Sequence, residues 1–167
     1  MFEDASAAMD YLFAGKGIVT LRSVRTGMHF TFKVARPKGH QPGGPLFDSV
    51  LVGGGEYRYL GMLSGAREFR TTAKSCPAKD TKAATASKFC VDGLNSGVIP
   101  DMLEISHEGR CGHCARLITT PSSLASGIGP ECAAKVGTAA PQAGAEARRQ
   151  GDRPLRGGRA GDGQPRA

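Results

Sequence analysis

The stretch IVTLRSVRTGMHFTFKV at residues 18–34 decides the fold. Apolar and polar side chains alternate along both of its halves, and Gly27 lies between them. A period of two is typical of a β-strand with one buried face, and glycine readily adopts the positive φ of a tight turn. The stretch therefore predicts a β-hairpin with one apolar face, formed on its second strand by Met28, Phe30, Phe32 and Val34.

Three more short strands are predicted after this hairpin, over residues 47–52, 57–63 and 67–72. Proline and glycine exclude regular structure from residues 36–45, and the triple glycine at residues 53–55 is predicted to be a hairpin turn. It is not a phosphate-binding loop, because no Lys-Ser or Lys-Thr follows and the chain continues into a strand. Alternation within residues 57–63 predicts that one face carries Tyr57, Tyr59, Gly61 and Leu63.

Two helices are predicted on either side of these strands. The first covers residues 1–14, with Asp4 or Ser6 as its N-cap. The second covers residues 77–94; it starts at Pro77 with Asp80 or Thr81 as a cap, and it ends before Gly97. Its apolar stripe is expected to pack across the sheet and consists of Ala83, Ala84, Ala86, Phe89, Cys90 and Leu94. A strand over residues 102–106 should follow.

The segments HEGRCGHC at residues 107–114 and GIGPEC at residues 127–132 carry the chemistry. Two cysteines separated by two residues on a tight turn can bind one ion, and Cys132 supplies a third thiolate. We expect His107 to be the fourth ligand, because a side chain between two such cysteines usually points away from the ion; His113 remains the alternative. The predicted metal ligands are His107, Cys111, Cys114 and Cys132.

The expected cofactor is one structural Zn²⁺ per chain. Zinc in a small module contributes roughly 10–16 kcal/mol of apparent binding free energy, which would supplement a modest core. A redox CxxC is the first alternative, but it would open a helix after a buried strand, whereas Pro121 and two serines follow here. A catalytic zinc is the second, with Glu108 or Glu131 as general base, although four protein ligands favour a closed site.

The run from His107 to Cys132 resembles a small, uncharacterised zinc-ribbon-like family of phage and prophage proteins. The pattern of that family is His-Glu-Gly-Arg-Cys-Gly-x-Cys-x-Arg-x-Leu-Thr-x-Pro-x-Ser, followed by Gly-x-Gly-Pro-x-Cys. This chain departs from the pattern at Ile118, which stands between Leu117 and Thr119. The resemblance implies a metal site and a phage origin, and it implies no particular activity.

The 167 residues are expected to form an α+β domain over residues 1–106 and a zinc-knuckle module over residues 107–136. The first is an antiparallel β-meander or small sheet with one packed helix. Residues 137–167 are rich in Gly, Ala, Pro and Arg and are predicted to be a disordered basic tail. The chain shows no signal peptide and no apolar run long enough to span a membrane. Five cysteines, three of them in the metal pattern, indicate a reducing compartment such as the cytoplasm.

A net charge of +7 and a pI near 9.4 favour an anionic partner, and nucleic acid is the usual one. Tyr57 and Tyr59 are further candidates, for stacking on bases. The alternative is a protein-interaction module or inhibitor that acts on a host replication, transcription or defence complex. An enzyme is not expected, because no paired carboxylates, nucleophile–base pair or cofactor loop is recognisable, and no small-molecule substrate is evident. The predicted nucleic-acid contacts are Arg25, Lys33, Arg36, Lys38, Arg110 and Arg116.

Overall fold

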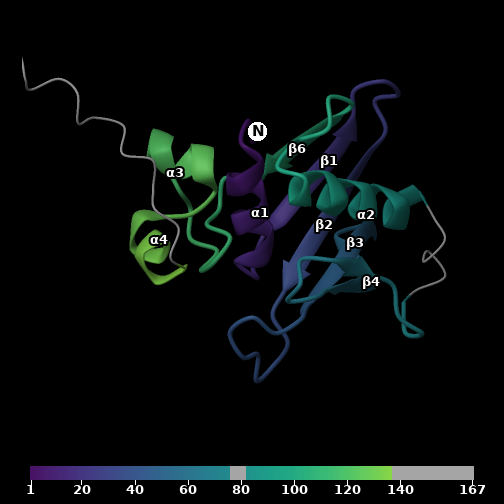
Figure 1. Cartoon of the computed structure of the whole chain (residues 1–167), viewed down its shortest axis with the longest axis horizontal. Helices are drawn as coiled ribbons and strands as arrows, with labels where there is room; N and C mark the ends of the chain where they lie inside the picture. The colour runs from purple at the N-terminus through teal and green to yellow at the C-terminus, as the bar shows by residue number, and fades with distance from the viewer. Residues whose placement is uncertain (76–81, 137–167) are drawn as a thin grey trace, which may run out of the picture.

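The computed structural model describes residues 1–75 and 82–136, and it confirms the α+β class. Six antiparallel strands form one curled sheet in the order β5-β4-β3-β2-β1-β6 (Figure 1). Consecutive strands β1 to β5 form the predicted meander, and β6 joins it on the free edge of β1. The strands are β1 (Ile18–Ser23), β2 (His29–Ala35), β3 (Leu46–Gly53), β4 (Glu56–Leu63), β5 (Phe69–Arg70) and β6 (Leu103–His107).

The hairpin of β1 and β2 forms as its alternation predicts. Leu21 pairs with Phe30 across the two strands, and Gly27 has a φ of +69° in the turn. Phe32 and Val34 are buried in the core and Phe30 is partly buried, whereas Met28 at the end of the apolar series is 40% exposed. The alternation therefore predicts the buried face correctly, and it fails only where the strand enters the turn.

The predicted faces of β4 are wrong beyond Tyr59, because the strand contains a bulge. Asp48 of β3 pairs with Gly61, but the next residue, Ser49, pairs with Tyr59, so that Leu60 has no partner of its own. An extra residue moves the following side chains to the opposite face. As a result Leu60 and Leu63 are both buried, although their spacing is odd.

Helices α1 (Ala5–Phe13) and α2 (Lys82–Asn95) lie against one face of the sheet (Figure 1). The carboxylate of Asp4 accepts a hydrogen bond from the backbone amide of Ala7, as an N-cap does. In α2, Phe89 is 42% exposed, which contradicts the predicted stripe. The predicted start of this helix, with Pro77, Asp80 and Thr81, lies outside the described residues. The buried residues of α2 are Ala83, Ala84, Ser87, Cys90, Val91 and Leu94.

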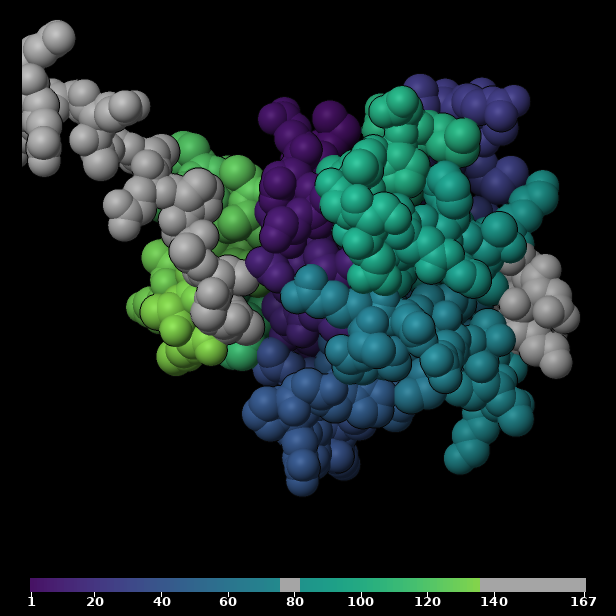
Figure 2. All heavy atoms as spheres, in the orientation of Figure 1, coloured from purple at the N-terminus to yellow at the C-terminus, as the bar shows by residue number. Residues whose placement is uncertain are grey.

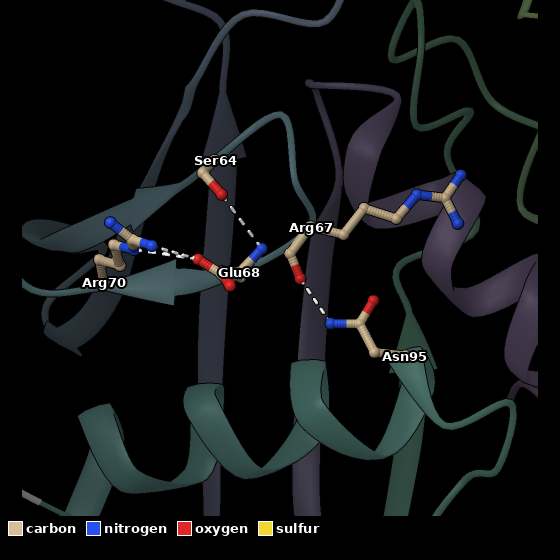
Figure 3. Close-up of polar contacts among 5 residues, drawn as sticks. All are labelled: Ser64, Arg67, Glu68, Arg70 and Asn95. Carbon is tan, nitrogen blue, oxygen red and sulfur yellow. Dashed lines mark hydrogen bonds and ion pairs between the residues drawn. The ribbon is translucent and has the colours of Figure 1, made fainter.

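The turn between β4 and β5 connects both helices to the sheet (Figure 3). Arg67 has a φ of +58° in this turn, and its carbonyl accepts a hydrogen bond from the side-chain amide of Asn95 at 2.6 Å. Its guanidinium lies 3.7 Å from the carboxylate of Asp10 in α1. In the same turn Glu68 pairs with Arg70 at 2.5 Å. These contacts hold the C-terminal end of α2 and one side of α1 over the same corner of the sheet.

Two short helices, α3 (Pro121–Ser126) and α4 (Pro130–Val136), lie on the other side of α1 from the sheet (Figures 1 and 2). Ile118, Ile128 and Cys132 from this part belong to the same cluster of buried side chains as the sheet residues. Residues 107–136 therefore share one continuous core with the preceding domain. The predicted disordered tail over residues 137–167 lies outside the described part of the chain.

Within residues 1–75 and 82–136, no helix has the length and apolar character needed to cross a membrane.

Candidate metal centre

Cys111 and Cys114 lie on a tight turn that folds back on itself. The amide of Cys111 donates to the carbonyl of Arg116, and the amide of Ala115 donates to the carbonyl of Cys111, both at 2.8 Å. Ala115, directly after the second cysteine, has a φ of +64°. This left-handed residue reverses the chain, and Arg110 and Leu117 then form an antiparallel bridge on either side of the turn. The turn directs both thiols to the same side.

Cys132 reaches the turn from helix α4. Gly127 ends α3 with a φ of +71°, which redirects the chain toward the two other cysteines. The amide of Gly112 donates to the carbonyl of Gly127 at 3.0 Å, and the amide of Gly129 donates to the Sγ of Cys111 at 3.3 Å. The glycine-rich segment before Cys132 thus lies directly against the first knuckle cysteine.

The three Sγ atoms of Cys111, Cys114 and Cys132 lie within 4.8 Å of one another. Sulfurs bound to one tetrahedral Zn²⁺ at about 2.3 Å are separated by about 3.8 Å, a spacing that is compatible with this limit. Cys111 is 1% exposed and Cys132 is 7% exposed. Three thiols of this spacing, two of them buried, form a possible metal-binding site, as predicted for these three residues.

The backbone around Cys111 favours a thiolate at this position. Burial alone would raise the pKa of the thiol, but hydrogen bonds from the amides of Gly129, Cys114 and His113 outweigh burial and lower the pKa. Burial, together with the two neighbouring sulfurs, raises the pKa of Cys132 to about 11. Three thiolates in such proximity repel one another, and a divalent cation removes that repulsion. The donor set therefore fits a thiophilic metal such as zinc.

His107, the predicted fourth ligand, has other partners in the structure. Its Nδ1 accepts a hydrogen bond from the amide of Gly109 at 3.1 Å, and its Nε2 lies 2.8 Å from the carbonyl oxygen of Leu124. Its ring packs against Phe2 and Tyr11, with centroids 5.1 and 5.4 Å away. Both ring nitrogens are thus occupied, and the cluster of ligand atoms within the described residues does not include His107. Through the contact with Leu124, His107 connects α3 to the end of β6.

His113, the alternative fourth ligand, faces the same cleft as the three cysteines. Its Nδ1 lies 2.8 Å from the guanidinium of Arg36, which also donates a hydrogen bond to the carbonyl of Ala14. Burial lowers the pKa of His113, and the charges of Arg36, Lys135 and Lys16 lower it further. A neutral imidazole is the form that ligates metals.

The cleft beside the sulfurs has a volume of about 470 Å³. It is lined by four cationic side chains, Lys16, Arg36, Arg116 and Lys135, and by one carboxylate, Glu131. Glu131 lies 3.6 Å from Arg116, and Glu108 lies 3.9 Å from Arg110. The two candidate general bases are therefore both in ion pairs. Sequence reasoning missed Lys16 and Lys135, because they come from the α1–β1 loop and α4 and meet only in the fold.

Two of the six predicted nucleic-acid contacts line the cleft. Arg36 and Arg116 line the cleft, whereas Arg25 lies in the β1–β2 turn and Lys38 in the following loop. Lys33 lies over the ring of Tyr57, 5.5 Å from its centroid. Arg110 donates to the carbonyl of Ala115 within the knuckle. The other candidate aromatic, Tyr59, packs edge-on against Phe47 at 5.7 Å.

A family of unknown function, DUF6011, matches residues 102–137. The matched range contains β6, both candidate histidines and the three clustered cysteines, so the match covers the candidate metal centre and not the sheet before it. It agrees with the predicted resemblance to an uncharacterised family. No curated protein and no solved structure matches the chain.

Proposed function

We propose that Cys111, Cys114 and Cys132 bind one structural Zn²⁺ and that the protein is a basic accessory protein that binds nucleic acid. The observation that supports the metal most directly is the grouping of three thiols within 4.8 Å, two from the turn at Cys111 and Cys114 and one from α4, with backbone amides directed at Cys111. The free thiols need a reducing compartment, so we infer a cytoplasmic location. The phage origin implied by the sequence pattern belongs to the same proposal.

We assign the ion a structural role. Zinc held by cysteines of a glycine-rich turn usually connects segments that are too short to fold alone, and α3 and α4 contain six and seven residues. His113 is our candidate for the fourth position, because it is the histidine that lines the cleft. Binding through Nδ1 requires that Arg36 give up its hydrogen bond to this atom.

Metal content and cobalt spectroscopy test the proposal. Elemental analysis of the purified chain should find one zinc, and Cys132→Ser should lose it or bind it much more weakly. Replacement of zinc by Co²⁺ should give thiolate-to-cobalt charge-transfer bands, and His113→Ala should shift the d–d bands if this histidine is a ligand. Cys90→Ser is the matched control, because Cys90 is also buried but lies on the inner face of α2, away from the three clustered cysteines. A metal-free wild-type chain that folds normally would contradict the proposal.

Binding of a labelled oligonucleotide tests the second part. Affinity that arises from phosphate contacts falls steeply between about 50 and 200 mM salt. The net charge of +7 and the cationic cleft support this expectation. Binding that is absent at low salt, or that does not change with salt, would contradict it.

A protein partner is the second candidate, and exposed apolar side chains of the module favour it. Leu117 is 67% exposed and Leu124 is 39% exposed. Apolar groups on a rigid zinc module are typical contacts for another protein. If the zinc-loaded chain binds no oligonucleotide at low salt, an interaction with a host replication, transcription or defence complex becomes the leading interpretation.

A further inference from the structure

The cationic cleft combines residues from parts of the chain that are far apart in sequence. Lys16 comes from the α1–β1 loop and Arg36 follows β2, whereas Arg116 and Lys135 come from the module that carries the cysteines. The amide of Lys16 donates to the carbonyl of Gly112 at 2.7 Å, and Arg36 contacts His113. These two contacts join the halves of the cleft directly at the knuckle.

The charge of the cleft stays positive after a metal is bound. Three thiolates and one Zn²⁺ have a net charge of −1, and Glu131 contributes another negative charge. Four cations therefore exceed the local negative charge. Lys16, Arg116 and Lys135 have exposed side chains that can reach a ligand, whereas Arg36 is half-buried and has a structural role.

The rest of the lining is suited to a backbone rather than to bases. Leu117, Ile118 and Pro130 contribute apolar groups, and Thr119, Thr120 and Ser123 contribute hydroxyls. The described lining includes no Asn, Gln, Phe or Tyr, and its one aromatic ring is that of His113 beside the cysteines. Amide side chains read adenine, and aromatic rings stack on bases. Lysine and arginine also read guanine, but about half to two-thirds of protein–DNA hydrogen bonds go to phosphate and sugar, so a lining of lysine and arginine without amide groups favours phosphate contacts.

We infer that this cleft is where the protein binds the phosphodiester backbone of nucleic acid, and that the bound metal assembles it. The inference rests on the proposed nucleic-acid function: it assigns that function to the cleft and makes it dependent on the bound metal. Removal of the ion releases the segment around Cys114 and Cys132, which separates Arg116 and Lys135 from Lys16 and Arg36. Affinity for nucleic acid then depends on metal, although the metal itself does not touch the ligand.

The test compares two double variants that remove the same charge. Lys16→Gln with Lys135→Gln removes two exposed cations from the cleft, and Lys74→Gln with Lys82→Gln removes two exposed cations outside its lining. Fluorescence anisotropy is measured with a labelled single strand of mixed sequence and with its duplex. The cleft variant should bind the single strand about tenfold more weakly at about 50 mM salt. The slope of its log binding constant against log salt concentration should be smaller in magnitude by about 1.4. The control variant should stay within about twofold of the wild type.

Each other outcome has a defined meaning. If the wild type binds neither probe, the proposed function itself fails. If it binds and both double variants weaken equally, contact is spread over the surface and the cleft is not the site. If the cleft variant loses its zinc, the cations serve only to neutralise the thiolates, and the inference is overturned. Equal affinity of the metal-free and zinc-loaded wild type would overturn the metal dependence.

Discussion

The ring of Tyr11 fills the space that a Cβ of Gly127 would occupy. This tyrosine also closes over Gly112, where a Cβ would lie 2.8 Å from its Cδ2 atom. Its hydroxyl donates to the carbonyl of Ile18 and accepts from the amide of the same residue, each at 3.3 Å. Burial raises the pKa of the Tyr11 phenol to about 12, so its hydroxyl stays protonated and can donate. One side chain of α1 therefore joins the metal module to the start of β1.

Gly127→Ala should destabilise the chain by about 2–4 kcal/mol. Part of the cost comes from a φ of +71°, which disfavours any Cβ by about 1–2 kcal/mol, and the remainder comes from the clash with Tyr11. Urea unfolding followed by circular dichroism measures the loss, and the zinc content should fall in parallel because the module is displaced.

The matched control is Gly97→Ala at the end of α2. Gly97 has a φ of +77°, but no heavy atom of the described residues lies within 4 Å of the place that an added Cβ would take. The substitution should therefore cost only about 1–2 kcal/mol, the conformational part alone. Equal losses for the two variants would show that contact with Tyr11 contributes nothing.

Ala115→Gly should stabilise the metal module. Ala115 has a φ of +64°, a conformation that costs a residue with a Cβ about 1–2 kcal/mol, and glycine avoids this cost while it loses more entropy on folding. We expect a net gain of up to about 1 kcal/mol and a tighter apparent zinc affinity, measured by competition with a chelator. Ala134→Gly in α4 is the control, because an exposed helical alanine should lose about 1 kcal/mol. The same sign of change at both positions would contradict the explanation.

His107→Asn should leave one zinc per chain and lower the thermal stability. The imidazole connects the amide of Gly109 to the carbonyl of Leu124 and packs against two aromatic rings, so its loss weakens the attachment of α3. We expect a loss of about 1–3 kcal/mol, the cost of unpaired polar groups and lost packing. His29→Asn, at an exposed position of β2, should change neither quantity. Loss of zinc in His107→Asn would restore His107 as the fourth ligand.

The sequence predicts those features that depend on local spacing. A period of two indicates the buried faces of β1 and β2, and the intervals between Cys111, Cys114 and Cys132 predict that they meet. The alternation of the strands and the pairing of Cys111 with Cys114 are imposed by geometry within one strand or one turn, whereas Cys132 joins them from α4 and is predicted from its residue type and the flanking glycines.

Features that depend on contacts between distant segments could not be predicted. The bulge at Leu60 arises from its register with β3, and the surroundings of His107 are supplied by Phe2 and Tyr11 from the other end of the chain. Proximity to the cysteines in sequence favours His107 as a ligand, and in the structure both of its ring nitrogens have other partners. A tyrosine on a mostly apolar helix is the one available signal that α1 makes a special contact.

Asp48 should make the stability of the fold depend on pH. Its carboxyl is 1% exposed, accepts a hydrogen bond from Ser87 at 2.8 Å, and leaves Oδ1 without a partner among the described residues. Burial raises its pKa from 3.8 to about 7. The folded chain thus binds this proton more tightly than the unfolded chain does. The free energy of unfolding should therefore fall as the pH rises from about 4 to about 7, by at most about 4 kcal/mol.

Asp48→Asn removes the titration and keeps the shape of the side chain. Its amide oxygen can still accept from Ser87, so the variant should lose most of the decline between about pH 4 and pH 7 and become more stable than the wild type near neutral pH. Urea unfolding at several pH values measures both curves, and Asp92→Asn on the exposed face of α2 controls for the change in net charge. Parallel pH profiles of the wild type and Asp48→Asn would show that the buried carboxyl does not control this dependence, because only its ionisation distinguishes the two chains in that range.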